Sequence, residues 1–197
     1  GVFCAGMDLK AFLRGEQIRI EGRGILGIAF TPPTKPLIAA VEGYALAGGC
    51  EAMLACDLAV AARNAQFGIP EVKRGLAAGA GGLLRLPRLI PPRIAMELAL
   101  TGDMIDAERA AALGLVNTLT EPGAALDEAR RLAARIIANA PLSVAASKRV
   151  IVEQRDWPLE EMFARQQAIT GPVIASADAR EGAAAFAEKR KPNWQGR

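Results

Sequence analysis

A short apolar run that leads through a glycine-rich turn into a helix-forming stretch constrains the fold of this chain most. Residues 37–41, LIAAV, are apolar and suit a strand buried on both faces. Residues 44–49, YALAGG, turn the chain into residues 50–56, whose alanine, leucine and methionine content favours a helix. Residues 58–62 and 65–71 predict two further strands. Because strands alternate with helices, we predict an α/β fold.

Helices are expected to dominate the rest of the chain. Residues 125–137 carry apolar residues at three- and four-residue spacing, and Asp106 can cap a helix that follows it. The sequence thus predicts two regions, a mixed core over residues 1–120 and a helical region over residues 121–197. The elements expected after residue 80 are a strand at residues 116–119 and helices at residues 83–89, 93–100, 107–113, 125–137, 141–153, 159–169 and 178–189.

The composition narrows the chemistry that is available. With 197 residues, 51% of them hydrophobic, the chain can bury one substantial core. It contains no histidine, which removes the commonest general base, the commonest metal ligand and every Ser–His or Cys–His pair. The serines, Ser143, Ser147 and Ser176, lie outside any G-x-S-x-G turn. Acid–base chemistry must therefore fall to carboxylates, lysine, Tyr44 or cysteine.

Charge, hydropathy and cysteine content exclude several classes of partner. The 24 basic and 21 acidic residues give a formal net charge of +3, an excess too small to indicate a nucleic-acid partner. No apolar run approaches the roughly 20 residues that a membrane helix needs. Cys4, Cys50 and Cys56 fit no metal-ligand spacing. They indicate a reducing compartment, for which the cytoplasm is the default.

The beginning of the sequence has no initiator methionine and no targeting pattern. It opens on an apolar strand end that runs into a glycine turn, and such a strand needs neighbours to satisfy its backbone. We therefore expect further strands before Gly1. Residues 12–30 are charged and glycine-rich, and they predict an amphipathic, mobile segment.

Two glycine turns follow apolar strands, one at FCAG before Met7 and one at ALA before Gly48 and Gly49. Each exposes backbone N–H groups at a predicted helix start, where the helix dipole favours developing negative charge. Glycine lets the backbone approach a ligand closely, so the pair could form an oxyanion hole. The alternative is that both are ordinary tight turns between strand and helix.

Two carboxylates lie in apolar surroundings close to these turns. Glu51 follows Gly49 in the first helical turn, and Glu71 follows Pro70 at the end of an apolar strand. Desolvation raises a carboxyl pKa, and two such groups can share the acid and base roles of water addition to a double bond. Alternatively, Glu51 stabilises its helix N-terminus and Glu71 pairs with Lys73 or Arg74 on the surface.

Five blocks together resemble the enoyl-CoA hydratase/isomerase, or crotonase, superfamily: FCAGMDLK, KPLIAAVEGYALAGGCE, DLAVAARNAQFGIPEV, GAGGLLRLPRLI and FAEKRKPNW. The resemblance covers nearly the whole chain. It implies a crotonase-like spiral (ββα) core and a helical C-terminal region that assembles homotrimers, often paired into hexamers. It also implies no metal and no redox cofactor, since coenzyme A is part of the acyl-CoA substrate.

The resemblance also implies roles for particular residues. The N–H groups of Met7 and Gly48 would bind the thioester carbonyl, Glu51 would activate water, and Glu71 would exchange the proton at the α-carbon. Gly79 would help to hold the water, although Ala78 replaces the proline common before it. The residues implied in CoA binding are Ala5, Met7, Asp8, Leu9 and Lys10, together with Phe186 and Lys189, which would reach the CoA of a neighbouring subunit; both lysines otherwise suit solvated surface positions.

A hydratase acting on 2-enoyl-CoA, of the fatty-acid β-oxidation type, is the function that these features favour. Isomerase relatives usually keep only one of the glutamates. A carnitinyl-CoA dehydratase or another acyl-CoA lyase or isomerase of the family is the nearest alternative, suggested by LRLPRLIPP and FAEKRKPNWQGR. A trimeric scaffold without activity, or an RNA-binding relative, is a further alternative that the retained glutamates disfavour. Acyl preference is expected to depend on pocket residues that include residues 16–29 and the segment expected before Gly1.

Overall fold

The computed structural model describes residues 1–17 and 20–197. They form two compact units. The core unit contains Gly1–Pro33 and Leu37–Arg131, and the C-terminal unit contains Thr34–Pro36 and Leu132–Arg197. The sequence-based division at residue 120 stays a prediction. No helix in the described part of the chain is long and apolar enough to cross a bilayer.

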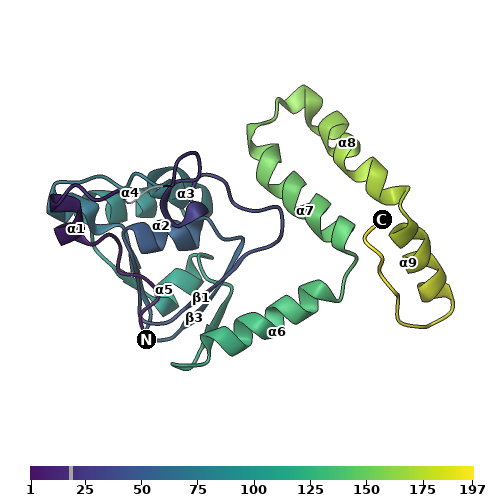
Figure 1. Ribbon diagram of the computed structural model, residues 1–197, viewed down its shortest axis with the longest axis horizontal. Coiled ribbons are helices and arrows are strands. Elements are labelled where there is room, and N and C mark those ends of the chain that lie inside the picture. The colour runs from purple at the N-terminus through teal and green to yellow at the C-terminus, as the bar shows by residue number, and fades with distance from the viewer. Residues whose placement is uncertain (18–19) are drawn as a thin grey trace. The chain divides into compact units, whose positions relative to one another are not determined.

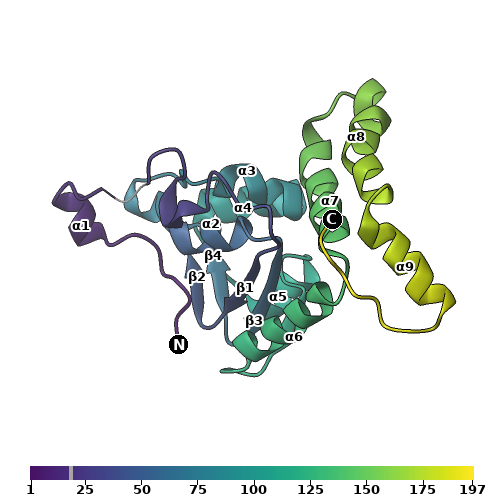
Figure 2. The ribbon, with the colours of Figure 1, turned by 45° about the vertical axis from the view of Figure 1, so that its right-hand side comes forward.

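The core unit contains two three-stranded sheets (Figure 2). Parallel strands β1 (Ile38–Val41), β3 (Leu58–Ala62) and β6 (Thr118–Thr120) form one sheet in that order. In the other sheet, β2 (Tyr44–Leu46) is parallel to β4 (Gln66–Gly68), which pairs antiparallel with β5 (Ile105–Asp106). Successive strands β1 to β4 therefore alternate between the sheets, so the chain adds one strand to each as it advances. This alternation is the spiral that the resemblance to the crotonase superfamily implied.

Helices connect and cover these strands (Figure 1). A left-handed Gly102 ends α4, and the Asp106 side chain caps α5 by accepting from Arg109 N at 2.7 Å. The helices of the core unit are α1 (Leu9–Leu13), α2 (Gly48–Leu54), α3 (Gly82–Leu89), α4 (Pro92–Thr101), α5 (Ala107–Ala112) and the start of α6 (Ala125–Ile137), with 3-10 turns at Ile25–Gly27 and Pro70–Arg74.

Small apolar residues make up much of the buried core. Phe67, Val41 and Val60 are fully buried, and alanines fill most neighbouring positions. The prediction for the first strand was wrong in one respect, because β1 alternates buried and half-buried positions whereas β3 is buried on both faces. The central strand β3 is covered on both faces, whereas one face of the edge strand β1 is only partly covered, so alternate side chains of β1 stay half-buried.

Several short elements differ from the sequence-based expectation. Residues 44–46 were expected in a turn but form β2, because Leu46 N donates to Cys4 O and Cys4 N donates to Tyr44 O, both at 2.9 Å. The strand expected over 65–71 ends at Gly68, and Glu71 lies in a 3-10 turn. The last strand, β6, begins two residues later than predicted.

The C-terminal unit is helical. The helices expected at 125–137 and 141–153 are confirmed as α6 and as α7 (Pro141–Glu153). The next, α8 (Met162–Ile174), begins later than predicted because a 3-10 turn at Leu159–Glu161 precedes it. It packs against α7, as Figures 1 and 2 show, and is followed by α9 (Ala177–Ala187).

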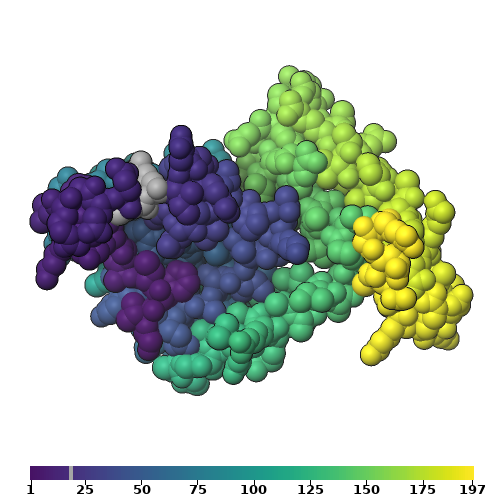
Figure 3. Space-filling model, viewed as in Figure 1, coloured from purple at the N-terminus to yellow at the C-terminus, as the bar shows by residue number. Residues whose placement is uncertain are grey.

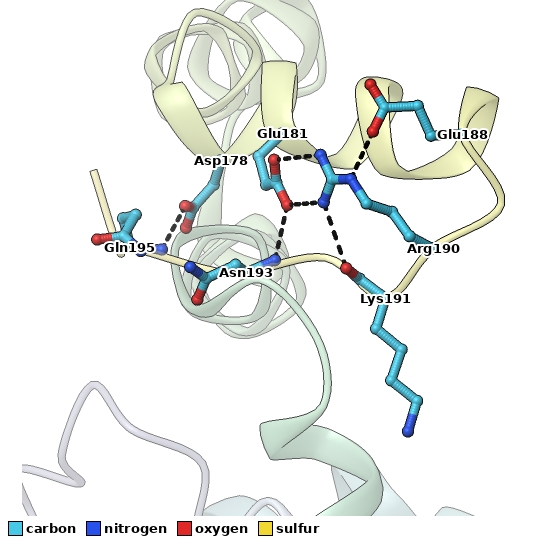
Figure 4. A network of polar contacts seen from close by, with 7 residues as sticks. All are labelled: Asp178, Glu181, Glu188, Arg190, Lys191, Asn193 and Gln195. Carbon is cyan, nitrogen blue, oxygen red and sulfur yellow. Dashed lines mark hydrogen bonds and ion pairs between the residues drawn. The ribbon is translucent and has the colours of Figure 1, made fainter.

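A polar network holds the last residues of the chain against α9 (Figure 4). Asp178 is buried, and its carboxylate accepts from Gln195 N at 2.7 Å and Gly196 N at 2.9 Å. Arg190 forms a two-armed ion pair with Glu181, at 2.6 and 3.0 Å. Hydrogen bonding to Arg190 lowers the pKa of Glu181 to about 2, so this carboxylate is ionised at neutral pH.

Candidate active site

A cavity of about 580 Å³ opens within the core unit. Its walls come from α1 and the turn before it, from the 3-10 turn at Ile25–Gly27, and from the start of α2. The segment that runs from Pro70 to Ala80 completes them. Much of the wall is apolar, and Glu51, Glu71, Lys73 and Arg74 are the charged residues that line it in the described part of the chain. The N-terminal residues, purple in Figure 3, lie on the outside of this unit.

The two glycine turns meet at this cavity. Gly6 has a φ of 102° and Ala47 a φ of 49°, so both turns reverse the chain sharply before a helix. Met7 and Gly48, the next residues, both line the cavity. Within residues 1–17 and 20–197, neither of their N–H groups donates to a protein oxygen. Two free main-chain donors therefore border one space.

Glu51 is held at the cavity by the loop before α3. Its side chain is buried, and Oε1 accepts hydrogen bonds from Ala80 N at 2.7 Å and Gly82 N at 2.8 Å. The carboxylate therefore binds at the start of α3 rather than stabilising its own helix, as the alternative interpretation had it. Two donors on one oxygen fix the orientation of the carboxylate.

Glu71 has no such partners. Its Oε2 is buried and makes no hydrogen bond to any described residue. Burial raises the pKa of Glu71, and the charge of Glu51 raises it further, against a lowering by a backbone hydrogen bond. The predicted alternative of a pair with Lys73 or Arg74 is wrong, because Lys73 Nζ contacts Asp103 at 2.6 Å and Arg74 donates to the Lys73 carbonyl.

Cys50 packs beside both carboxylates but offers no nucleophile. It is buried, and burial raises the pKa of its thiol to about 12, with further upward contributions from Glu71 and Glu51 and an opposing hydrogen bond at Gly68. The thiol therefore stays protonated at neutral pH and acts as a small apolar side chain. In the described residues, no group of three or more His, Cys, Asp or Glu side chains could hold a metal ion.

The sequence profile of the enoyl-CoA hydratase/isomerase family matches residues 1–197. The chain belongs to this family. Crystal structures of enoyl-CoA hydratases from Mycobacterium marinum and Mycobacterium tuberculosis match with TM-scores of 0.98 at 67% and 66% identity, over 100% of this chain and 78% of theirs. A carnitinyl-CoA dehydratase of Citrobacter koseri is 44% identical over 202 residues, which cover 99% of this chain and 77% of that protein. The predicted crotonase-like fold is confirmed.

Some of the other residues singled out by the crotonase resemblance line the cavity and some do not. Ala5, Leu9 and Gly79 line the cavity together with Met7. Asp8 does not; its Oδ1 caps α1 by accepting from Lys10 N at 2.8 Å, and Lys10 is exposed. The roles proposed for these residues stay predictions.

Phe186 and Lys189 lie at the end of α9 in the C-terminal unit. Phe186 is 88% exposed, and Lys189 has a φ of 55° in the turn that follows the helix. Neither lines the cavity of the core unit. Their predicted contact with the CoA of a neighbouring subunit stays a prediction.

Sequence reasoning missed part of the cavity wall. The expected contribution of residues 16–29 is met by Ile25 and Leu26, while residues 18–19 lie outside the described residues. Phe12 and Leu76 also line the cavity without having been singled out. Their apolar character was visible, but the five-residue helix α1 that carries Phe12 is too short to show a periodicity, and the loop that carries Leu76 has none.

Gly49→Ala is expected to destabilise this family member by about 1–3 kcal/mol, because a Cβ at residue 49 would overlap the Cys4 backbone carbonyl. The atoms that this Cβ would meet are the backbone and the Cβ of Cys4, which cannot move without moving the main chain. Gly171→Ala in α8 is the control, since its Cβ would meet nothing within 4 Å beyond its chain neighbours; because Pro172 follows it, no gain in helix stability is expected. Urea denaturation midpoints measure both, and an unchanged midpoint for Gly49→Ala would contradict the close approach of the two turns.

Proposed function

We propose that this chain catalyses the reversible addition of water to a 2-enoyl-CoA thioester, as expected for fatty-acid β-oxidation. The observation that supports the proposal most is the position of Glu51 and Glu71 on one cavity, beside two unpaired main-chain donors. Isomerisation alone would need one carboxylate. Water addition uses two, one to take a proton from water and one to give a proton to carbon.

In the proposed reaction, the N–H groups of Met7 and Gly48 hydrogen-bond the thioester oxygen and stabilise the enolate charge that develops on it. Glu51 takes a proton from water, whose oxygen bonds to the β-carbon. The electron pair of the double bond moves toward the thioester. Glu71 then donates its proton to the α-carbon, and the reverse sequence removes water.

The direction of the Glu71 pKa suits this division of roles. Burial and a neighbouring negative charge raise the pKa of Glu71 and so favour its protonated form, which is the form that the acid of hydration needs. Glu51, whose Oε1 already accepts two N–H donors, is oriented to act on water. Gly79 lines the same cavity and is the residue we propose to help hold that water.

The charges near Glu71 favour an uncharged acyl tail. Carnitinyl-CoA carries a quaternary ammonium, which proteins recognise with aromatic faces or carboxylates. Apart from the two proposed catalytic glutamates, the charged groups on the described cavity wall are Lys73, whose ammonium is paired with Asp103, and the cation of Arg74. We therefore propose an enoyl-CoA hydratase, with carnitinyl-CoA dehydratase as the second candidate because of the 44% identity to the Citrobacter koseri protein.

Purified protein should hydrate a four-carbon 2-enoyl-CoA and prefer it at least about 10-fold in kcat/KM over crotonobetainyl-CoA, the analogous thioester that bears a trimethylammonium group. Loss of the ultraviolet absorbance of the conjugated thioester measures both rates. Arg74→Gln should narrow the preference, because it removes a cation from the cavity wall. A preference for the charged substrate would favour the dehydratase, and RNA binding that competes with CoA, without hydration, would revive the scaffold alternative.

We also propose a homotrimer or hexamer in the cytoplasm that needs no added metal, redox cofactor or nucleic acid. The resemblance to the crotonase superfamily supports this. Residues of the helical region, such as Phe163 and Ile174, leave large apolar side chains exposed, at 84% and 75%. Light scattering of the purified protein gives the mass of the assembly. Activity that survives treatment with a chelator would support the proposal that no metal is needed.

A further inference from the structure

Arg85 of α3 reaches two separate segments of the core unit. Its Nη1 donates to Ala80 O at 3.2 Å and its Nη2 donates to Ala29 O at 2.5 Å. The side chain is half-buried, and Ala29 is 1% exposed. A planar guanidinium has its donors in a fixed fork, so these two bonds set the separation of the carbonyls they join.

The loop that Arg85 holds is the one that orients Glu51. Ala80 donates its N–H to Glu51 Oε1 and accepts from Arg85 through its carbonyl. Gly82 N is the second donor to the same oxygen. Between them, Gly81 has a φ of 101°, and a Cβ there would overlap Arg85 Nη1. The loop is therefore fixed on one side by a cation and on the other by an anion.

The opposite charges of Arg85 and Glu51 also favour this position of the loop between them. Burial lowers the pKa of Arg85 and the charge of Glu51 raises it, so the two groups attract across the loop. No ion pair joins them directly within the described residues. The other titratable groups that interact with Glu51 are Glu71 and the protonated Cys50 thiol.

The second segment forms part of the cavity wall. Ala29 follows the 3-10 turn at Ile25–Gly27, and Ile25 and Leu26 of this turn line the cavity. Arg85 therefore connects the wall to the loop that holds the carboxylate, although Arg85 itself does not line the cavity.

We propose that Arg85 is a positioning residue, which holds the Ala80–Gly82 loop so that its two N–H groups orient Glu51, and which fixes the Ile25–Ala29 wall relative to that loop. The inference rests on the proposed catalytic role of Glu51. It places part of the control of the reaction on a side chain that touches neither substrate nor carboxylate.

Arg85→Gln should lower kcat by about 10- to 100-fold, the range expected when a catalytic group is displaced by a fraction of an ångström to 1 Å. Arg85→Lys keeps the charge but not the fork, and should recover only part of that loss. KM should change by less than about threefold, because no substrate contact is removed. Arg93→Gln, an exposed substitution on the neighbouring helix α4, is the control and should leave both constants unchanged.

A double-mutant cycle separates positioning from general destabilisation. If Arg85 acts through Glu51, Arg85→Gln should cause less than about a threefold further loss in a Glu51→Gln background. The proposal would be overturned if the double variant lost kcat by the product of the two single losses and its thermal stability fell to a matching extent.

Amide hydrogen exchange gives a readout that does not depend on any reaction. In the protein without substrate, Arg85→Gln should speed exchange at Ala80 N and Gly82 N by at least about 10-fold, while Arg93→Gln should not. Unchanged exchange at both amides would overturn the inference even if hydration is observed. If the wild-type protein fails to hydrate any enoyl-CoA, the proposed function falls, and the exchange experiment alone decides the role of Arg85.

Discussion

Glu51→Gln and Glu71→Gln should each slow hydration of a 2-enoyl-CoA by at least about 100-fold while acyl-CoA binding is largely preserved. Glutamine keeps the shape of the side chain but cannot exchange the proton. At residue 51 its carbonyl can still accept from Ala80 N and Gly82 N, which in the wild type share one carboxylate oxygen. The loss would therefore report proton transfer rather than a rearranged loop.

The measurement is kcat with a four-carbon enoyl-CoA, together with the Kd of a saturated acyl-CoA that cannot react. Glu97→Gln, an exposed substitution on α4, serves as the matched control and should retain wild-type kcat. Near-normal turnover of either variant would contradict the two-carboxylate reaction. A variant that lost binding and activity together would indicate damage to the cavity instead, which thermal unfolding would reveal.

Gly48→Pro should lower kcat by about 100- to 1,000-fold, the usual effect of removing one oxyanion donor. Proline has no N–H, and the first position of a helix, which residue 48 occupies in α2, is where proline is best tolerated. Gly48→Ala is the matched control, because it keeps the N–H. Its added Cβ would meet only the flexible end of Ile25, at 2.9 Å from Cδ1.

The comparison of the two variants isolates the donor. Equal kcat values for Gly48→Pro and Gly48→Ala would show that the N–H of residue 48 contributes nothing to the reaction. Because proline also restricts Ala47, whose φ is 49°, a second variant is needed. Incorporation of glycolic acid at residue 48 replaces the N–H by an oxygen without adding atoms, and it should reproduce the loss.

The long helices could be predicted from the sequence because their signals are local. The helix over 141–153 begins with proline, and 125–137 carries its own apolar spacing, so neither depends on a distant partner. The strand β2 could not be predicted in this way. Its three residues are strand because distant segments supply their partners, β4 some 20 positions later and Cys4 some 40 positions earlier.

The same distinction applies to the candidate site. The glycine turns and the two glutamates stand out in the sequence, because glycine and an acidic residue in apolar surroundings are each unusual at those positions. The contact of Glu51 with Ala80 and Gly82 was not predicted, since it joins residues about 30 positions apart. Arg85 was missed for a related reason, because a basic residue on an amphipathic helix usually points to solvent.

The contact between Gly49 and the Cys4 carbonyl joins the two glycine turns through main chain alone. Main-chain contacts, which include the hydrogen bond from Leu46 N to Cys4 O, therefore hold together the two turns that carry the Met7 and Gly48 N–H groups. Wall residues such as Phe12, Ile25 and Leu76 are free to vary, so descendants of this sequence could accept differently shaped acyl tails while keeping one way of polarising the thioester.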